Sequence, residues 1–365
     1  MRAIVTPHHG GIEVLEYHLD WPDPAVAPGE VLVAVGACGL NNTDVNTRAG
    51  WYSKAVEEGT GAGGGAGFGT TRPADAGWGG VPITFPLIQG ADVCGRIAAV
   101  GAGVPAARVG ERVLVDPWLR DPAAPDDIAR ATYLGSERNG GFAERVAVPS
   151  ENAIAIDSPL SDVELASFPT AYLTAVNMLR RAALAAGETV LVTGASGGVG
   201  GALVQLVSAA GARAIAVTSP DKAAAVVAAG AVATIARDAD DLAAALRAAA
   251  GIETVDLVAD VVGGAAFPAL LAVLRRGGRY VTSGAIGGPL VELDLRTLYL
   301  HDLTAIGATV PPRDAFEGLV RTIERGVLRP LVAATYPLER FREAQERFME
   351  KRHVGNIVID VAAAQ

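Results

Sequence analysis

The 365-residue sequence predicts an α/β protein in which a β-rich part is joined to a doubly wound parallel sheet. Short Val- and Ile-rich runs fill much of the chain up to residue 149. From residue 188 to residue 285, apolar strands alternate regularly with helices, and a glycine-rich turn joins the first of these strands to its helix. Such alternation is typical of a parallel sheet covered by helices on both faces. The length suits two domains.

The N-terminal part is predicted to consist of short strands joined by tight turns. Gly, Pro and Asp separate its apolar runs, as they do between strands. The expected strands are residues 30–40, 95–103, 111–117 and 143–149. Two irregular segments interrupt this pattern. Residues 53–84 are so rich in glycine that we expect a mobile loop, and residues 117–140 form a second, polar excursion.

The second half begins with helical periodicity over residues 161–187. Ser161 is a plausible N-cap because Glu164 follows three residues later, the spacing of a capping box. A strand is also expected at residues 356–363. Between these segments, strands are expected at residues 188–194, 213–219, 233–238, 255–263 and 279–285, and helices at residues 198–210, 221–230, 240–250 and 265–277.

Composition excludes several classes of function. The formal net charge is −10 and no basic block occurs, so we expect no nucleic-acid partner. No run of about 18 strongly apolar residues is present, which predicts no membrane span. The start lacks the apolar stretch of a signal peptide, and two cysteines cannot form a disulfide framework. A cytoplasmic protein that binds a small molecule fits these observations.

The sharpest local motif is the glycine turn between residues 194 and 200. An apolar strand, Val190–Val192, leads into Gly194, Ser196, Gly197, Gly198, Val199 and Gly200, and a helix follows. Glycines at such a junction permit a tight turn, a close backbone approach to a pyrophosphate and close helix–strand packing. The helix N-terminus then offers N–H groups to the phosphates. The position of this turn inside a strand–helix array favours dinucleotide binding over a turn that binds nothing.

The tip of the next strand indicates which dinucleotide binds. Enzymes that use NAD usually carry an acid about 20 residues past the first glycine, where it binds the ribose hydroxyls. This strand instead ends in Thr218 and Ser219, and Lys222 follows. A hydroxyl and a lysine can hydrogen-bond and neutralise a 2′-phosphate, which predicts NADP(H). Asp221 lies close by, and Lys222 could instead be a solvated helix residue.

Taken together, these motifs resemble the medium-chain dehydrogenase/reductase superfamily from end to end. The likeness is carried by ASGGVG, VDLVADVVGG, LRRGGRYV, GGFAERVAVP and HVGNIVIDV. The resemblance implies a GroES-like catalytic domain from residues 1–158 and 300–365, and a Rossmann domain from residues 159–299. It also implies that Val262 and Gly263 contact the cofactor, and that the protein is a homodimer.

Within that superfamily the deciding question is zinc. Its zinc alcohol dehydrogenases carry a cysteine and a histidine ligand at positions that correspond to Asn41 and Ala91 in this sequence. An amide and a methyl group do not replace a thiolate and an imidazole at a tetrahedral zinc site. Residues 117–140 contain no cysteine, and the five histidines show no ligand spacing. We therefore predict neither catalytic nor structural zinc.

The segment Gly39–Tyr52 is similar to the quinone oxidoreductase branch. That likeness implies that Asn41 and Asp44 lie by the nicotinamide and Tyr52 near the substrate carbonyl. Two plainer interpretations stay open: Asp44 and Arg48 have the spacing of a helical ion pair, and Tyr52 could only anchor a loop. The segment 53–84, which directly follows Tyr52, could form a lid or a pocket wall.

The resulting hypothesis is hydride transfer from NADPH to a conjugated acceptor, a quinone or an enone. Conjugation moves the developing negative charge onto oxygen, where a hydrogen bond from Tyr52 or water stabilises it. One alternative is a zinc-independent alcohol or aldehyde dehydrogenase, since a fold does not fix a function. A second is a non-catalytic NADPH-binding protein.

Overall fold

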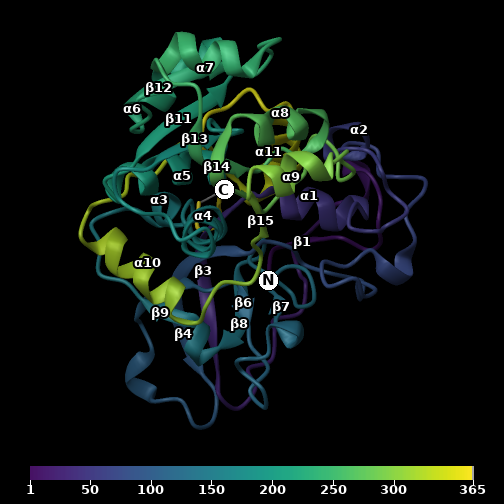
Figure 1. Cartoon of the computed structure of the whole chain (residues 1–365). Coiled ribbons are helices and arrows are strands. Elements are labelled where there is room, and N and C mark those ends of the chain that lie inside the picture. The colour runs from purple at the N-terminus through teal and green to yellow at the C-terminus, as the bar shows by residue number, and fades with distance from the viewer. Residues whose placement is uncertain (364–365) are drawn as a thin grey trace. The chain divides into compact units, whose positions relative to one another are not determined.

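A computed structural model describes residues 1–363 of the chain, which divides into two compact units (Figure 1). The β-rich unit comprises Met1–Val56, Gly61–Thr170 and the chain from Phe316 onward. The Rossmann unit comprises Glu57–Thr60 and Ala171–Ala315. Both boundaries lie later in the chain than the expected residues 158 and 300. Helix α3 (Asp162–Leu165) packs on the β-rich sheet, and strand β15 (Thr304–Gly307) belongs to the parallel sheet.

The β-rich unit is built on a seven-stranded sheet. The spatial order is β16–β17–β3–β4–β5–β9, and β8 also pairs with β3. The strands are β3 (Glu30–Gly39), β4 (Asp92–Val100), β5 (Arg112–Val115), β8 (Arg145–Pro149), β9 (Ala153–Ala155), β16 (Val332–Pro337) and β17 (Asn356–Asp360). Because β17 pairs antiparallel with β3, the C-terminal strand joins the N-terminal part of the chain in one sheet. All four strands expected before residue 150 are present.

Smaller elements complete the β-rich unit. Strand β1 (Ala3–Val5) pairs with β2 (Glu16–His18), and β6 (Trp118–Leu119) pairs with β7 (Thr132–Tyr133). Helix α1 (Asn42–Ala49) follows β3 directly, and α11 (Phe341–Met349) packs on β16 and β17. The ring of Phe341 lies 4.6 Å from that of Phe142 in the core. Burial of such apolar faces is the main stabilising term of the unit.

Residues 53–84 are more ordered than their glycine content suggested. They contain helix α2 (Thr60–Gly63) and a 3-10 turn at Pro73–Asp75. The Ser53 hydroxyl donates to Asp75 at 2.7 Å, and the backbone N–H of Ile12 donates to the carbonyl of Gly65 at 2.8 Å. The expected mobile loop is therefore tied down by hydrogen bonds at several points, which supply the contacts that glycines cannot make through side chains.

The Rossmann unit contains a six-stranded sheet in which all neighbouring strands are parallel. The spatial order is β12–β11–β10–β13–β14–β15, the doubly wound order of dinucleotide-binding folds. The strands before β15 are β10 (Thr189–Val192), β11 (Arg213–Thr218), β12 (Ala233–Ala236), β13 (Val255–Asp260) and β14 (Leu274–Thr282). This topology confirms the predicted α/β class and the strand–helix alternation.

Helices flank this sheet as the alternation predicted (Figure 1). They are α4 (Pro169–Arg181), α5 (Gly198–Ala209), α6 (Ala223–Ala228), α7 (Leu242–Ala250), α8 (Phe267–Ala272) and α9 (Leu295–Leu300), and α10 (Asp314–Glu324) crosses the later boundary. Ser161 and Glu164 form the predicted capping box of α3. The single helix expected over residues 161–187 is divided, because Pro169 starts a new helix. Among residues 1–363, no helix is long and apolar enough to cross a membrane.

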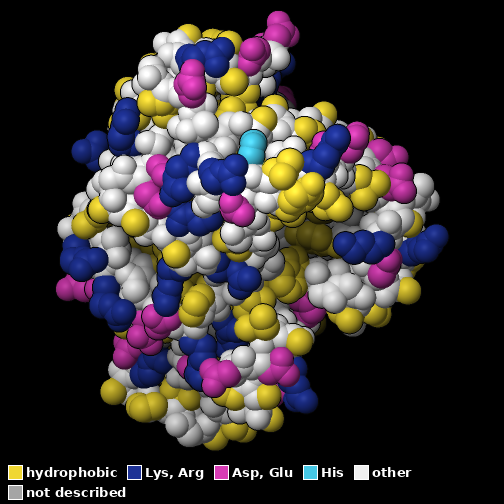
Figure 2. All heavy atoms as spheres, viewed as in Figure 1, with side chains coloured by type: hydrophobic (Ala, Val, Ile, Leu, Met, Phe, Trp, Pro, Cys, Tyr) yellow, Lys and Arg dark blue, Asp and Glu magenta, His cyan; other side chains and the backbone are white. Residues whose placement is uncertain are grey.

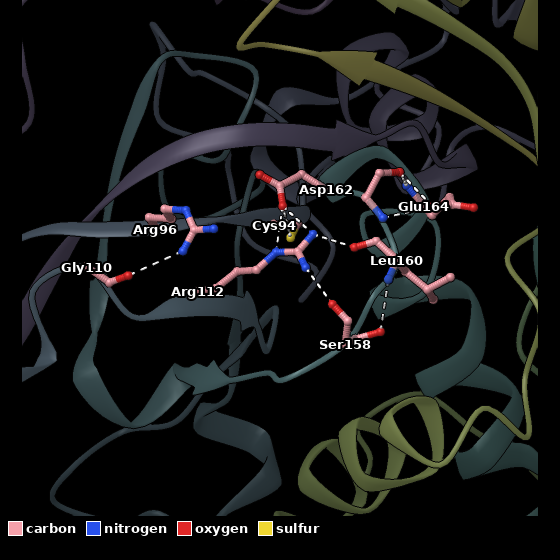
Figure 3. Close-up of polar contacts among 9 residues, drawn as sticks. Cys94, Arg96, Gly110, Arg112, Ser158, Leu160, Asp162 and Glu164 are labelled. Carbon is pink, nitrogen blue, oxygen red and sulfur yellow. Dashed lines mark hydrogen bonds and ion pairs between the residues drawn. The ribbon is translucent and has the colours of Figure 1, made fainter.

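Arg112 fixes the chain that leads from the β-rich sheet into α3 (Figure 3). Its guanidinium donates to the Asp162 carboxylate at 2.7 Å and to the carbonyls of Ser158 and Leu160 at 3.0 and 2.7 Å. Replacing Arg112 with methionine keeps the aliphatic stem and removes the guanidinium that donates to these three acceptors. We expect the free energy of unfolding, measured by urea titration, to fall by about 1–3 kcal/mol.

Arg96 provides the matched control for this substitution. Its exposed guanidinium makes a longer hydrogen bond, 3.4 Å, to the carbonyl of Gly110 (Figure 3). Arg96→Met should change the free energy of unfolding by no more than about 0.5 kcal/mol. Equal effects of the two substitutions would contradict the role given to Arg112.

Candidate active site

The glycine turn has the strand–turn–helix geometry that the sequence predicted. Gly194 follows β10 with a φ of +56°, a conformation that favours glycine, and Gly197 is the N-cap of α5. A Cβ atom on Gly200 would lie 2.1 Å from the carbonyl oxygen of Gly194. Only glycine therefore permits this close approach of helix to turn. Ser196 to Val199 are half-buried, and the first N–H groups of α5 follow the turn.

The loop after β13 lies against the same turn and is organised by Asp260. This carboxylate is fully buried and accepts the backbone N–H groups of Val262 and Gly263 at 2.9 and 3.0 Å. It also accepts the hydroxyl of Thr193, the residue before the turn. A Cβ on Gly194 would lie 3.3 Å from a methyl carbon of Val262. The structure thus brings together two of the predicted cofactor segments through Asp260, an acid that the sequence reasoning passed over.

The predicted phosphate-binding residues gather at the tip of β11. The Thr218 hydroxyl is buried and has no hydrogen-bond partner among residues 1–363, and Lys222 is 8% exposed. The Ser219 hydroxyl donates to Asp221 and lowers the pKa of that carboxyl. Burial lowers the pKa of Lys222, and the nearby charge of Arg237 lowers it further, although Asp221 opposes both effects. Arg237 was not predicted, because it follows the next strand along the chain.

In the β-rich unit, Asn41 and Asp44 lie together at the junction between the end of β3 and the start of α1. The Asp44 carboxylate is 2% exposed and accepts the backbone N–H groups of Asn41, at 2.7 Å, and of Gly90. Burial raises the pKa of Asp44 to about 8, and the charge of Asp92 acts in the same direction. The surroundings of Asp44 therefore favour its neutral, protonated form more than water does.

Asp92, at the start of β4, extends this cluster on the other side of Asn41. The Asn41 amide nitrogen donates to Asp92 Oδ2 at 2.9 Å, and the backbone N–H of Thr170 donates to Asp92 Oδ1 at 2.7 Å. The Thr170 hydroxyl makes a short hydrogen bond to the same oxygen and lies 2.7 Å from the Tyr133 hydroxyl. No periodicity or spacing in the sequence joins these residues, since they come from four separate segments.

Tyr52 is half-buried beyond the end of α1, and its hydroxyl donates to Thr43 Oγ1 at 3.2 Å. Burial raises its pKa, and the charge of Asp44 adds to that effect. The phenol therefore keeps its proton at neutral pH and can donate a hydrogen bond. The same electrostatic neighbourhood includes Tyr133, whose pKa is raised by burial and by the charges of Asp92 and Asp44.

Arg48 does not form the helical ion pair with Asp44 that its spacing allowed. Its fully buried guanidinium donates to the carbonyls of Gly10 and Gly64 at 2.8 and 2.7 Å, and to Gln345 Oε1 at 2.9 Å. These partners come from the N-terminal region, the glycine-rich segment and α11. Arg48 thus anchors the glycine-rich segment beside the helix that carries Asp44.

Comparison with known proteins shows the family to which this architecture belongs. Residues 27–158 match the alcohol dehydrogenase GroES-like domain family, and residues 229–359 match the zinc-binding dehydrogenase family. The acryloyl-coenzyme A reductase of Metallosphaera sedula is 30% identical, with 98% of this chain and 99% of that protein covered. The chain belongs to the medium-chain dehydrogenase/reductase superfamily.

Other members of the superfamily are similar over nearly the whole chain. The human quinone oxidoreductase is 25% identical, with 96% of this chain and 94% of that protein covered. The solved structure of a provisionally named alcohol dehydrogenase from Sinorhizobium meliloti 1021 is 48% identical, with a TM-score of 0.88 and coverages of 99% and 96%. Membership confirms the GroES-like and Rossmann folds, and makes this chain an oxidoreductase of the class that uses nicotinamide cofactors.

Since some members of the superfamily bind zinc, the donor set at the corresponding positions is informative. Asn41 turns its amide N–H group toward Asp92, and Ala91 offers only a methyl group. Within residues 1–363, no group of three or more His, Cys, Asp or Glu side chains could hold a metal ion. The residues at these positions do not fit a tetrahedral zinc ion.

The Rossmann unit, in contrast, fits a nicotinamide dinucleotide. The turn at Gly194 to Gly200 has the close approach that a pyrophosphate requires, and no side chain caps the N-terminus of α5 at Gly197. The buried, unpartnered Thr218 hydroxyl lies at the tip of β11, beside Lys222. When bound, such a cofactor supplies a hydride.

Proposed function

We propose that this protein is an NADPH-dependent reductase of conjugated carbonyl compounds, either quinones or α,β-unsaturated enoyl compounds, that works without catalytic zinc. The observation that carries the proposal is the buried cluster around Asn41 and Asp44, in which amide and carboxyl groups are hydrogen-bonded and no thiolate or imidazole takes part. Hydrogen bonds alone activate an isolated ketone weakly compared with a Lewis acid. A conjugated acceptor spreads the developing charge onto an oxygen that such donors can stabilise.

In this proposal each group of side chains has a separate task. Asn41 and Asp44 line the position of the nicotinamide, and Tyr52 donates a hydrogen bond to the acceptor oxygen. The residues of the glycine turn, with Val262 and Gly263, hold the pyrophosphate region, while Thr218, Ser219 and Lys222 hold the 2′-phosphate. The names of the acryloyl-coenzyme A reductase and the quinone oxidoreductase support an acceptor of the conjugated type.

The first test is to follow NADPH oxidation with a panel of quinones, enones and saturated ketones, with and without a chelator. Turnover of the conjugated acceptors that is indifferent to chelator is expected. A second candidate, a zinc-independent alcohol dehydrogenase, is favoured by the Sinorhizobium meliloti relative. Oxidation of saturated alcohols with NADP⁺ and no turnover of enones would select that candidate. Turnover of ketones that a chelator abolishes would refute the zinc-free mechanism.

The substitution Tyr52→Phe tests the hydrogen bond to the acceptor. Loss of one donor to a developing oxyanion lowers kcat by about 10²-fold in comparable sites, and we expect a fall of that size. The KM for NADPH should stay unchanged, because Tyr52 does not bind the cofactor in this proposal. Tyr17→Phe removes the hydroxyl of a tyrosine outside the cluster and should leave kcat as it is. An unchanged kcat of Tyr52→Phe with several acceptors would remove Tyr52 from this role.

We also propose that the protein forms a homodimer through the surface around α9. Its exposed apolar side chains include Leu295, Tyr299 and Leu300, at 64, 62 and 52% exposure. Figure 2 shows hydrophobic side chains gathered over this helix, and β15, the edge strand of the parallel sheet, follows it. Apolar patches of this kind on a folded protein mark interaction surfaces.

The double substitution Leu295→Glu and Tyr299→Glu tests this surface. It should convert a dimer into a monomer in multi-angle light scattering, since two carboxylates would be buried without partners. Val109→Glu, at an isolated exposed valine of the β-rich unit, should leave the mass unchanged. A monomeric wild-type protein would contradict the homodimer.

A further inference from the structure

A continuous chain of hydrogen bonds links Tyr133 to Asp92 through Thr170. The Tyr133 and Thr170 hydroxyl oxygens are 2.7 Å apart, and the Thr170 hydroxyl makes a short hydrogen bond to Asp92 Oδ1. The other carboxylate oxygen, Oδ2, accepts the amide of Asn41 at 2.9 Å. Tyr133 and Asp92 are 5% and 1% exposed, so water does not compete with these hydrogen bonds. The proposed function assigns a task to Asn41 and none to the other three residues.

The direction in which the hydroxyl groups of these linked hydrogen bonds donate depends on one proton, on Asp92. Each hydroxyl has a single hydrogen, so Thr170 that donates to an ionised Asp92 can only accept from Tyr133. The Tyr133 hydrogen is then used within the chain. If Asp92 carries a proton on Oδ1 instead, it donates to Thr170, Thr170 donates to Tyr133, and the Tyr133 hydrogen is released for another acceptor. A proton on the buried carboxyl group thus becomes available at the phenol, two hydrogen bonds away.

We propose that Tyr133, Thr170 and Asp92 form a relay that delivers the proton of the reduction. This inference rests on the proposed function, because the reduced acceptor is the base that takes the proton. The acceptor gains two electrons and a hydrogen as hydride from the cofactor. It then takes the Tyr133 proton, as Thr170 reprotonates Tyr133 and Asp92 reprotonates Thr170. Asp92 ends as the carboxylate and, once the product has left, recovers one proton from solvent back through the Tyr133 and Thr170 hydroxyls, so the charges and atoms balance.

The surroundings of Asp92 suit a group that stores a proton. Cys38 on β3, Asp44 on α1 and Tyr133 on β7 are the titratable groups that face it. None is a cation, and among residues 1–363 Asp92 forms no ion pair. Burial raises the pKa of Asp92 to about 6, against the hydrogen bonds from Asn41 and Thr170, which lower it. A proton on Asp92 is therefore accessible near neutral pH.

Tyr133 is suited to a conservative test because its ring and its hydroxyl have different partners. The ring packs edge-on against Trp118, with centroids 4.8 Å apart, and is stacked with Trp78 at 6.3 Å. Tyr133→Phe keeps these ring contacts and removes only the end of the relay. Thr170→Val removes the middle while the backbone N–H bond to Asp92 remains, and Thr170→Ser keeps a hydroxyl at that position. Tyr17→Phe is the control for loss of a phenolic hydroxyl elsewhere in the unit.

The experiment compares steady-state reduction of an enone by the full-length variants with the titration of Asp92. The kcat of Tyr133→Phe and of Thr170→Val should fall by about 10²-fold, the size of a general-acid contribution, with an unchanged KM for NADPH. Thr170→Ser should recover most of the loss. The double variant should be no slower than either single variant, because both interrupt the same relay. In the wild type kcat should decline as pH rises through the pKa of Asp92, a decline that Thr170→Val removes.

Carbon NMR of the protein labelled with ¹³C-aspartate, with Asp92→Asn for assignment, gives a readout independent of turnover. The titration of Asp92 should move to higher pH in Thr170→Val and stay in place in Tyr17→Phe. If the wild type reduces enones, three results would each overturn the relay but leave the proposed function standing. They are an undiminished kcat in Thr170→Val or Tyr133→Phe, additive losses in the double variant, and an unmoved Asp92 titration. Absence of turnover with every conjugated acceptor in the wild type would refute the proposed function, and the relay with it.

Discussion

Replacing Gly200 with alanine is expected to abolish high-affinity binding of NADPH and to destabilise the Rossmann unit. The added Cβ would meet three backbone atoms of Gly194 and Ala195 between 2.1 and 2.7 Å, and backbone cannot move aside as a flexible side chain can. Relieving such a clash separates α5 from the turn, and overpacking of this kind costs about 3 kcal/mol. If a similar free energy is lost from NADPH binding at this turn, the Kd for NADPH rises by about 100-fold. Calorimetric unfolding and NADPH titration measure the two effects.

Gly197→Ala is the matched control within the same turn. The nearest atom to its added Cβ is the Gly194 carbonyl oxygen at 3.4 Å, and its φ of −82° suits any residue. Stability should change by less than about 1 kcal/mol, the range of an N-cap substitution. If this turn holds the pyrophosphate, the new methyl group occupies space that the cofactor needs, and NADPH binding should weaken in a stable protein. Wild-type affinity in Gly197→Ala would show that the phosphates bind elsewhere.

The sequence predicted the Rossmann unit well because its signals are local. The strand, the glycine turn and the helix from Val190 to Ala209 are consecutive, so periodicity and glycine spacing suffice to find them. The domain boundaries were predicted less accurately. The sheet on which α3 packs and the sheet in which β15 pairs are both decided by contacts between distant segments. The expected helix at residues 265–277 was too long for the same reason. Its last four residues, 274–277, belong instead to β14, in which Leu274 lies opposite Val255.

The candidate site was predicted only in part, and the reason is again distance along the chain. Asn41, Asp44 and Tyr52 lie within one short segment and could be selected together by resemblance. Asp92, Tyr133 and Thr170 join them only through contacts that span many residues. An aspartate that opens an apolar strand directly after Ala91 was a usable signal, because a buried carboxylate needs partners. No comparable signal marked Tyr133 or Arg237.

The two carboxyl groups of the cluster show how burial without a cation can shape the chemistry. Burial raises the pKa of both Asp44 and Asp92, and the charge of Asp92 raises that of Asp44 further, while their hydrogen-bond partners are amide and hydroxyl groups rather than guanidinium or ammonium groups. A site of this kind stores protons and offers hydrogen-bond donors at neutral pH. It therefore suits a reduction in which one proton must accompany each hydride.

Removing the two cations near the tip of β11 is expected to reverse the preference for NADPH. Lys222 is nearly buried, and its pKa responds to the charge of Arg237, so the two cations act on a common position. Each charged hydrogen bond to a 2′-phosphate contributes about 1.5–3 kcal/mol. Lys222→Met with Arg237→Met should therefore raise the KM for NADPH by about 100-fold or more. NADH lacks the 2′-phosphate, so its kcat/KM should stay within a few-fold of the wild-type value.

Arg213→Met provides the control, because Arg213 is an exposed cation at the opposite end of β11. It should leave the ratio of kcat/KM for NADPH and NADH unchanged, which separates a local contact from the loss of positive charge in general. A similar loss with NADH in the double variant would mean that Lys222 and Arg237 maintain the fold of the strand tip rather than bind phosphate. A wild-type enzyme that favours NADH would refute the assignment of Thr218, Ser219 and Lys222 to the 2′-phosphate. In that case Asp221, exposed and ionised at the same strand tip, is the group that would bind the ribose hydroxyls.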